Sequence, residues 1–113
     1  TLITAGHQEM KVAREETFGP LSVLIPFDQE EEAIAMANDT EYGLAAYFYT
    51  RDLGRTFRVG SALEYGMIGI NAGIITTEVA PFGGVKDSGQ GREGGRQGLD
   101  DYLNVKYLSI AGI

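Results

Sequence analysis

The sequence contains no cysteine, and this absence excludes several kinds of chemistry within its 113 residues. Without a thiol there can be no disulfide, no thiolate metal site and no cysteine nucleophile among them. No run of about 18 or more apolar residues occurs, and no signal-peptide pattern opens the chain. We therefore expect a soluble, cytoplasmic protein that has no membrane partner.

Basic residues are also scarce, since 9 Lys and Arg stand against 16 Asp and Glu, and the net charge is −7. Binding to nucleic acid needs a basic surface that displaces counterions from phosphates, so we expect no nucleic-acid partner. His7 is the only histidine and has no acidic or nucleophilic neighbour in a motif, which predicts a surface residue. The acidic run at residues 30–32 suits the first turn of a helix, and no metal site is predicted.

Glycine is abundant by contrast, with 16 residues, which predicts many tight turns. The apolar share of 43% argues against disorder. A chain of this length can bury roughly 65% of its unfolded surface, so we expect one modest core.

Apolar runs bounded by turn residues predict four strands, over residues 21–27, 43–50, 66–71 and 105–110. Two helical patterns lie between the first three. The first covers residues 28–38 and opens with a capping pair of Asp28 and Glu31. Asp52 is expected to cap the second helix, in which the apolar spacing is helical. The resulting order of strand, helix, strand, helix and strand predicts parallel strands in an α/β layer.

The glycine-rich segment at residues 89–94 matches G-x-G-x-x-G, but its surroundings do not fit a dinucleotide fingerprint. No hydrophobic strand precedes it, and the chain ends before the acidic residue that the fingerprint requires. We therefore expect a glycine-rich turn that leads into a third helix over residues 92–103, weakened by its glycines. Lys86 and Ser88 likewise do not form a phosphate-binding G-K-[ST] loop.

The predicted strand over residues 105–110 has no partner in this order. From the residues alone, an antiparallel edge strand of the same sheet is the simpler interpretation, and pairing with another chain is the alternative. A second ambiguous segment is residues 14–20, where Glu15 and Glu16 precede Phe18 and a Gly-Pro turn. Solvated acids in a loop are the simpler interpretation there.

Two long motifs change both interpretations: E-E-T-F-G-P at residues 15–20, and P-F-G-G-V-K-D-S-G-Q-G-R-E at residues 81–93. Shorter matches lie at residues 32–34, 37–38, 42–46 and 69–71. In this order and over nearly the whole chain, the sequence resembles the NAD(P)-dependent aldehyde dehydrogenases. Residues 73–81 and 100–107 are most similar to the succinate- and glutarate-semialdehyde enzymes of that family.

The resemblance implies an α/β fold, in which residues 1–103 are a parallel-sheet portion of the catalytic domain. Residues 104–113 would be a C-terminal strand that joins a neighbouring subunit of a homo-oligomer, a dimer or tetramer. Asn104 departs from the pattern, because many members carry there a glutamate that ties the dimer interface together.

The resemblance also implies site residues. Glu16 would accept hydrogen bonds from the nicotinamide ribose of NAD or NADP, and Phe18 would pack beside the nicotinamide. Phe82 would line the aldehyde tunnel. Thr76 stands where semialdehyde enzymes place a serine against the substrate carboxylate, and Asn71 matches a buried asparagine that orders the active-site loops.

In this family a cysteine thiolate attacks the aldehyde, a hydride passes to the cofactor, and water activated by a glutamate hydrolyses the thioester. The resemblance places the cysteine and the glutamate upstream of Thr1, so this segment would contain no catalytic residue. We expect a C-terminal segment of an oxidoreductase that converts succinic semialdehyde to succinate and is inactive alone. The alternative is a non-catalytic association module with the same fold.

Overall fold

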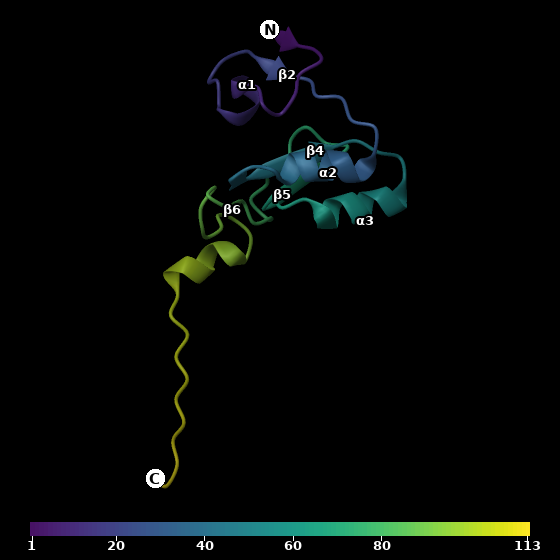
Figure 1. Cartoon of the computed structure of the whole chain (residues 1–113). Coiled ribbons are helices and arrows are strands. Elements are labelled where there is room, and N and C mark those ends of the chain that lie inside the picture. The colour runs from purple at the N-terminus through teal and green to yellow at the C-terminus, as the bar shows by residue number, and fades with distance from the viewer.

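The computed structural model describes all of residues 1–113 and shows a molecule in three parts (Figure 1). A small N-terminal unit lies above a central α/β layer, and the C-terminal residues extend away from both as a tail (Figure 1). The radius of gyration is 19.0 Å, and the molecule measures 74 × 33 × 24 Å. A compact domain of this length would have a radius of gyration of about 13 Å.

The N-terminal unit contains β1 (Leu2–Ile3), α1 (Lys11–Arg14) and β2 (Ser22–Val23). β1 and β2 are parallel, with Leu2 opposite Ser22. The strand predicted over residues 21–27 is therefore shorter, and it pairs with β1 and not with the central strands. Our prediction that it belongs to one continuous layer is wrong. One physical reason is Pro26, which has no N–H for a longer ladder.

The central layer confirms the predicted α/β character. It contains α2 (Glu30–Asn38), β3 (Tyr42–Gly43), β4 (Ala45–Phe48), α3 (Leu53–Ala62) and β5 (Met67–Ile70). β4 and β5 run parallel, in register from Ala45 opposite Met67 to Phe48 opposite Ile70, and α3 is the crossover between them. The strand predicted over residues 43–50 is split into β3 and β4, because β3 pairs elsewhere.

The two central helices begin differently. Asp52 is the N-cap of α3, and its side chain accepts a hydrogen bond from the Arg55 N–H, as predicted. The capping pair predicted for α2 is wrong, since the N-cap is Gln29 and makes no side-chain cap bond. Glu32, and not Glu31, reaches back to the N–H of Asp28 at 2.9 Å, because the helix starts later than predicted and places Glu32 at its third position.

After the layer the chain forms β6 (Val85–Lys86), which is antiparallel to β3, and then η1, a 3-10 helix over Gln97–Tyr102. The helix predicted over residues 92–103 is thus only partly present. Gly94 and Gly95 have positive φ angles of 67° and 56°, and this left-handed backbone cannot continue a right-handed helix. Gly89, Gly91 and Gly94 have positive φ angles, the backbone conformation for which the glycine-rich segment was predicted to need glycine.

Residues 104–113 make no hydrogen bond within the chain and form no strand. Val105 and Ile113 are fully exposed. The interpretation of residues 105–110 as an antiparallel edge strand of the same sheet is therefore wrong, because no strand of the layer lies beside this segment. Pairing with another chain stays a prediction.

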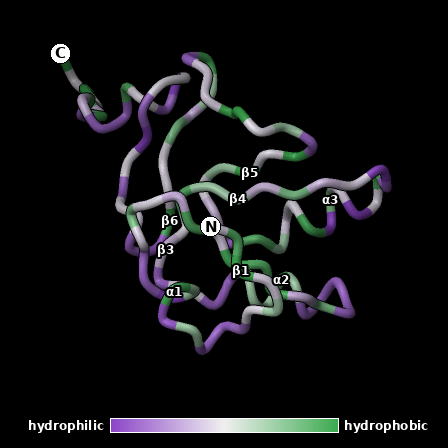
Figure 2. Tube along the Cα trace, turned by 90° about the horizontal axis from the view of Figure 1, so that it is seen from above, coloured by the Kyte–Doolittle hydropathy of each residue, from purple (hydrophilic) through white to green (hydrophobic).

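The core is much smaller than composition suggested. Five of the 113 residues are buried, and Val59 is the only apolar side chain among them. The accessible surface is 9088 Å², whereas a compact monomer of this mass exposes roughly 6,100 Å². Figure 2 shows apolar segments distributed along the whole trace and not gathered at one centre. The expectation of one modest core is wrong, because most apolar faces have no cover within these residues.

α3 is the longest α-helix, at 10 residues. None of the helices combines the length and the apolar character that crossing a lipid bilayer requires.

Candidate functional site

Glu16 and Phe18 lie in the loop that follows α1, and both line an open cavity of about 350 Å³. The walls of this cavity come from α1, the loop itself and β2. Phe18 is 96% exposed, so its ring makes little contact with this chain. The structure therefore brings the two predicted cofactor residues together at one surface.

The two adjacent acids differ in their surroundings. Glu15 lies 3.5 Å from the Lys11 ammonium, in an ion pair of i,i+4 spacing. Glu16 forms no ion pair, its carboxylate accepts no hydrogen bond from this chain, and it is exposed. An ionised carboxylate with its lone pairs free can accept two hydroxyl groups at once. The group at Glu16 fits the vicinal hydroxyls of a ribose.

Thr76 and Phe82 line a second cavity, of about 190 Å³, together with the start of β5. Phe82 is half-buried, whereas Thr76 is exposed and its hydroxyl makes no hydrogen bond within the chain. The neighbouring hydroxyl of Thr77 lies 3.5 Å from the Glu78 carboxylate. Thr76 therefore presents a free donor beside an aromatic wall.

Phe82 is held by the folding of residues 82–93 onto themselves. Phe82 and Glu93 exchange two backbone hydrogen bonds of 2.7 Å each. The guanidinium of Arg92 donates to the carbonyls of Gly84 at 2.8 Å and Gly91 at 2.6 Å. Gly66, just before β5, needs to be a glycine, because a Cβ there would collide with the Gly83 carbonyl. These contacts hold Phe82 in the wall of the cavity that it shares with the start of β5.

Lys86 and Ser88 bind other parts of the protein backbone. Lys86 Nζ donates to the carbonyls of Asn38 at 2.9 Å and Thr40 at 3.1 Å, and it lies 2.6 Å from a Glu64 carboxylate oxygen. Ser88 Oγ accepts from the Gly43 N–H at 2.9 Å. The sequence interpretation missed this role of Lys86. A useful signal was the helix end at Asn38, where free carbonyls attract a cation.

Asn71 is exposed, so the prediction of a buried asparagine is wrong for this structure. It lies at the end of β5 with a φ of 54°, a left-handed conformation that asparagine tolerates better than most residues. His7 is exposed, as predicted. No three His, Asp or Glu side chains lie close enough together to hold a metal ion.

The most strongly shifted acid lies between α2 and α3, outside both cavities. Hydrogen bonds from Arg58 and then from Arg55 lower the pKa of Glu30 from 4.5 to about 2. Both arginines lie 2.6 Å from the Glu30 carboxylate, which is 18% exposed. The ion pairs of Glu30 with Arg55 and Arg58 join the two helices, and no nucleophile or general base lies in this cluster.

Comparison with known proteins gives the family. Residues 1–108 match the aldehyde dehydrogenase family. A succinate semialdehyde dehydrogenase of Acinetobacter baylyi is 60% identical over 113 residues, covering 100% of this chain and 23% of that protein. An NADP(+) succinate-semialdehyde dehydrogenase of Escherichia coli is 66% identical over 88% of this chain and 21% of its own length. A glutarate-semialdehyde dehydrogenase of Pseudomonas putida is 65% identical, also over 88% of this chain and 21% of its own length.

Solved structures agree. A crystal structure of an aldehyde dehydrogenase from Brucella melitensis superposes with a TM-score of 0.91 at 60% identity, covering 95% of this chain and 22% of that one. An indole-3-acetaldehyde dehydrogenase of P. syringae, in complex with NAD+, gives a TM-score of 0.89 at 39% identity, covering 93% and 21%. The chain spans about a fifth of the length of the curated relatives that it matches. With this sequence match and this fold, the chain belongs to the aldehyde dehydrogenase family.

Proposed function

We propose that residues 1–113 act as part of a longer NAD(P)-dependent aldehyde dehydrogenase, which oxidises succinic semialdehyde to succinate. The observation that carries this proposal is the sorting of four residues into two cavities according to their expected roles. Glu16 and Phe18 share one cavity, and Thr76 and Phe82 share the other. The Glu16 carboxylate in the first cavity and the Thr76 hydroxyl in the second have no hydrogen-bond partner in this chain.

On the cofactor side, the Glu16 carboxylate holds the hydroxyls of the nicotinamide ribose with two charge-assisted hydrogen bonds. The Phe18 ring limits how far the nicotinamide can turn. When bound, NAD(P) supplies the acceptor for the hydride that leaves the substrate. The E. coli relative carries NADP(+) in its name and the P. syringae structure contains NAD+, so the proposal includes both cofactors.

On the substrate side, the Thr76 hydroxyl donates a hydrogen bond to the carboxylate of the semialdehyde. Phe82 forms an apolar wall beside the carbon chain and keeps water from that side. We choose succinic semialdehyde as the proposed substrate because two of the similar proteins are named for it. The P. putida relative is named for the glutaric compound, which is one carbon longer, so a direct comparison of both substrates is needed.

The nucleophilic thiolate and the carboxylate that activates water belong, in this proposal, to residues outside this chain, which contains no cysteine. The 113-residue chain would then supply only walls and hydrogen-bonding groups, and would be inactive alone. Residues 104–113 would pair with a second copy in a homo-oligomer, since their backbone groups have no partner in this chain. The cytoplasmic location stays a prediction.

The test is to purify the longer polypeptide and the 113-residue chain and to follow the reduction of NAD+ and NADP+ at 340 nm, with succinic, glutaric and uncharged aldehydes. We expect the highest kcat/KM of the longer protein with succinic semialdehyde and no turnover by the short chain. Turnover by the short chain would refute the proposal that the catalytic residues lie outside residues 1–113. A longer protein that self-associates but oxidises no aldehyde would instead support the association module.

A further inference from the structure

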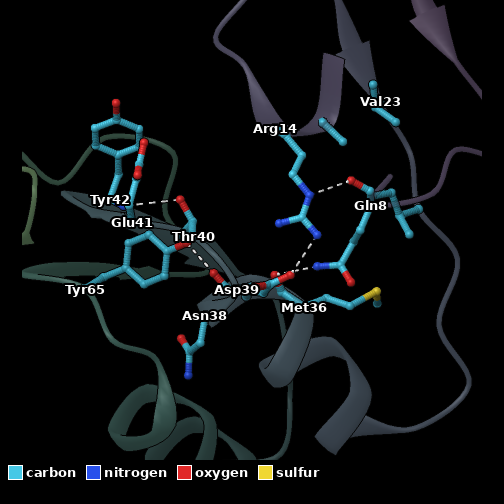
Figure 3. Close-up of a pocket in the computed structure, with 13 residues that line it drawn as sticks. Gln8, Arg14, Val23, Met36, Asn38, Asp39, Thr40, Glu41, Tyr42 and Tyr65 are labelled. Carbon is cyan, nitrogen blue, oxygen red and sulfur yellow. Dashed lines mark hydrogen bonds and ion pairs between the residues drawn. The ribbon is translucent and has the colours of Figure 1, made fainter. Parts of the chain in front are cut away.

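The part of the chain that carries Glu16 and Phe18 is joined to the rest by few polar contacts. Two hydrogen bonds connect the side chains and backbone of residues 1–27 with those of residues 28–113, and no other hydrogen bond or ion pair does so. Gln8 Nε2 donates to the Met36 carbonyl at 3.2 Å, and Arg14 Nη2 donates to Asp39 Oδ2 at 3.1 Å (Figure 3).

Both bonds end on the last turn of α2 and the residue that follows it. Arg14 is central to this junction, because its Nε also donates to the Gln8 carbonyl at 3.1 Å. One guanidinium therefore both orients Gln8 and reaches Asp39. Figure 3 shows the Arg14 side chain extending from α1 across the gap toward Asp39.

The substrate side is anchored to the same turn. Lys86, four residues after Phe82 in the chain, donates to the carbonyls of Asn38 and Thr40. Tyr65, just before β5, donates its hydroxyl to the Ala37 carbonyl at 2.6 Å. Residues 36–40, which we name the α2 joint, thus receive contacts from both the cofactor side and the substrate side.

Packing does little to fix the two parts relative to each other. An open cleft of about 820 Å³ lies between them, with Val23 and Ile25 on one wall and Met36 and Tyr65 on the other. Because this cleft is open, the Arg14–Asp39 and Gln8–Met36 bonds are the direct restraints on the approach of the N-terminal unit.

We propose that Arg14 and Asp39 are positioning residues. Their hydrogen bond ties the N-terminal unit to the α2 joint and so fixes the position of the Glu16 carboxylate relative to Phe82. This inference rests on the proposed function. Arg14 precedes Glu16 by only two residues, so a change in its anchoring is passed directly to the loop that holds the cofactor. The pair is about half-exposed, at 46% and 55%, and such pairs add little stability. Its loss should therefore change cofactor geometry more than it changes thermal stability.

The test is a double-mutant cycle in the longer protein, with Arg14→Met, Asp39→Ala and the two combined. Lys11→Gln is the matched control, because it removes a cation from the same helix whose partner, Glu15, lies within the N-terminal unit. Cofactor KM, kcat and thermal midpoint are measured for each variant. Hydrogen exchange of the Glu15 and Leu21 N–H groups, which donate backbone bonds on either side of Glu16, is measured without substrate.

We expect each single variant to raise the cofactor KM about twofold to fivefold, with a double variant no worse than the single ones. Exchange of the Glu15 and Leu21 N–H groups should become faster, and Asp39→Asn, which keeps an acceptor, should lie between wild type and Asp39→Ala. Additive effects, or effects no larger than those of Lys11→Gln, would overturn the proposal. If the wild-type protein oxidises no aldehyde, the proposed function fails, while hydrogen exchange still decides whether Arg14 and Asp39 restrain the loop.

Discussion

The side-chain amide of Asn71 binds both backbone groups of Thr50. Its Oδ1 accepts from the Thr50 N–H at 2.9 Å, and its Nδ2 donates to the Thr50 carbonyl at 2.7 Å. The β4–β5 register ends at Phe48 opposite Ile70, so the amide takes the place of the next backbone pair. It thereby holds the loop before α3 against the loop that leads to Thr76.

Replacing Asn71 separates the effect of this amide from that of its backbone conformation. Asn71→Ala removes both hydrogen bonds and places a less tolerant residue at φ 54°, and should lower the stability of the longer protein by about 1–3 kcal/mol. Asn71→Gly removes the bonds but keeps the conformation, so it should cost less. The thermal midpoints of the two variants check this order. Equal midpoints for wild type and Asn71→Ala would contradict it.

The central β4–α3–β5 unit could be predicted from the sequence because its signals are local. Asp52 stands next to the helix that it caps, and each strand is an apolar run between turn residues. Two features could not be predicted in this way. β1 is only two residues long, and its pairing with β2 joins segments about twenty residues apart, which no periodicity reveals. The small core was missed because composition shows how much apolar surface exists and not whether a partner covers it.

The candidate site was predicted by motif and not by geometry. The motif alone gives no physical reason why Glu16, and not Glu15, should have the free carboxylate. The i,i+4 spacing of Lys11 and Glu15, which is that of a helical ion pair, does give one. That spacing was available in the sequence and would have marked Glu16 as the free acid. The contacts of Arg92 to carbonyls depend on the folded loop, so they could not be predicted from spacing. For Lys86 the helix end at Asn38 predicted that a cation would bind there, but not which one.

Thr76 should be needed for a substrate carboxylate and not for the aldehyde group. Thr76→Val keeps the shape and removes the hydroxyl. The activation free energy derived from kcat/KM for succinic semialdehyde should therefore rise by about 1.5–3 kcal/mol, while kcat/KM for butanal stays unchanged. Thr76→Ser keeps the donor and should retain activity. Thr77→Val is the control, since that hydroxyl faces Glu78. Equal losses for both aldehydes in Thr76→Val would contradict the assignment.

Acid should weaken the junction between α2 and α3. The pKa of Glu30 is about 2 in the folded protein and 4.5 without its arginine partners. A lowered pKa contributes stability that is complete above about pH 4.5 and is lost as the pH falls toward 2. Glu30→Gln should therefore have a lower midpoint than wild type at pH 7, with the difference shrinking below pH 4.5. Thermal midpoints between pH 7 and pH 2.5 test this, with Glu31→Gln as the control, since Glu31 forms no ion pair.

The tail should determine the oligomeric state. Leu108→Pro removes an N–H from the middle of the predicted strand, so it should block pairing with a second copy and release smaller species. Ile113→Pro lies beyond that strand and should leave the assembly intact. Light scattering of both variants of the longer protein measures their mass. An unchanged mass for Leu108→Pro would show that residues 105–110 do not form the interface.

The most direct measurement compares the two adjacent acids in the longer protein. Glu16→Gln and Glu15→Gln each remove one negative charge from neighbouring positions, but only Glu16 has a carboxylate without a partner. We predict that Glu16→Gln weakens productive cofactor binding by about 1.5–3 kcal/mol in kcat/KM for NAD(P), while Glu15→Gln stays near wild type. Unchanged cofactor kinetics in Glu16→Gln, or equal losses in both variants, would contradict the account.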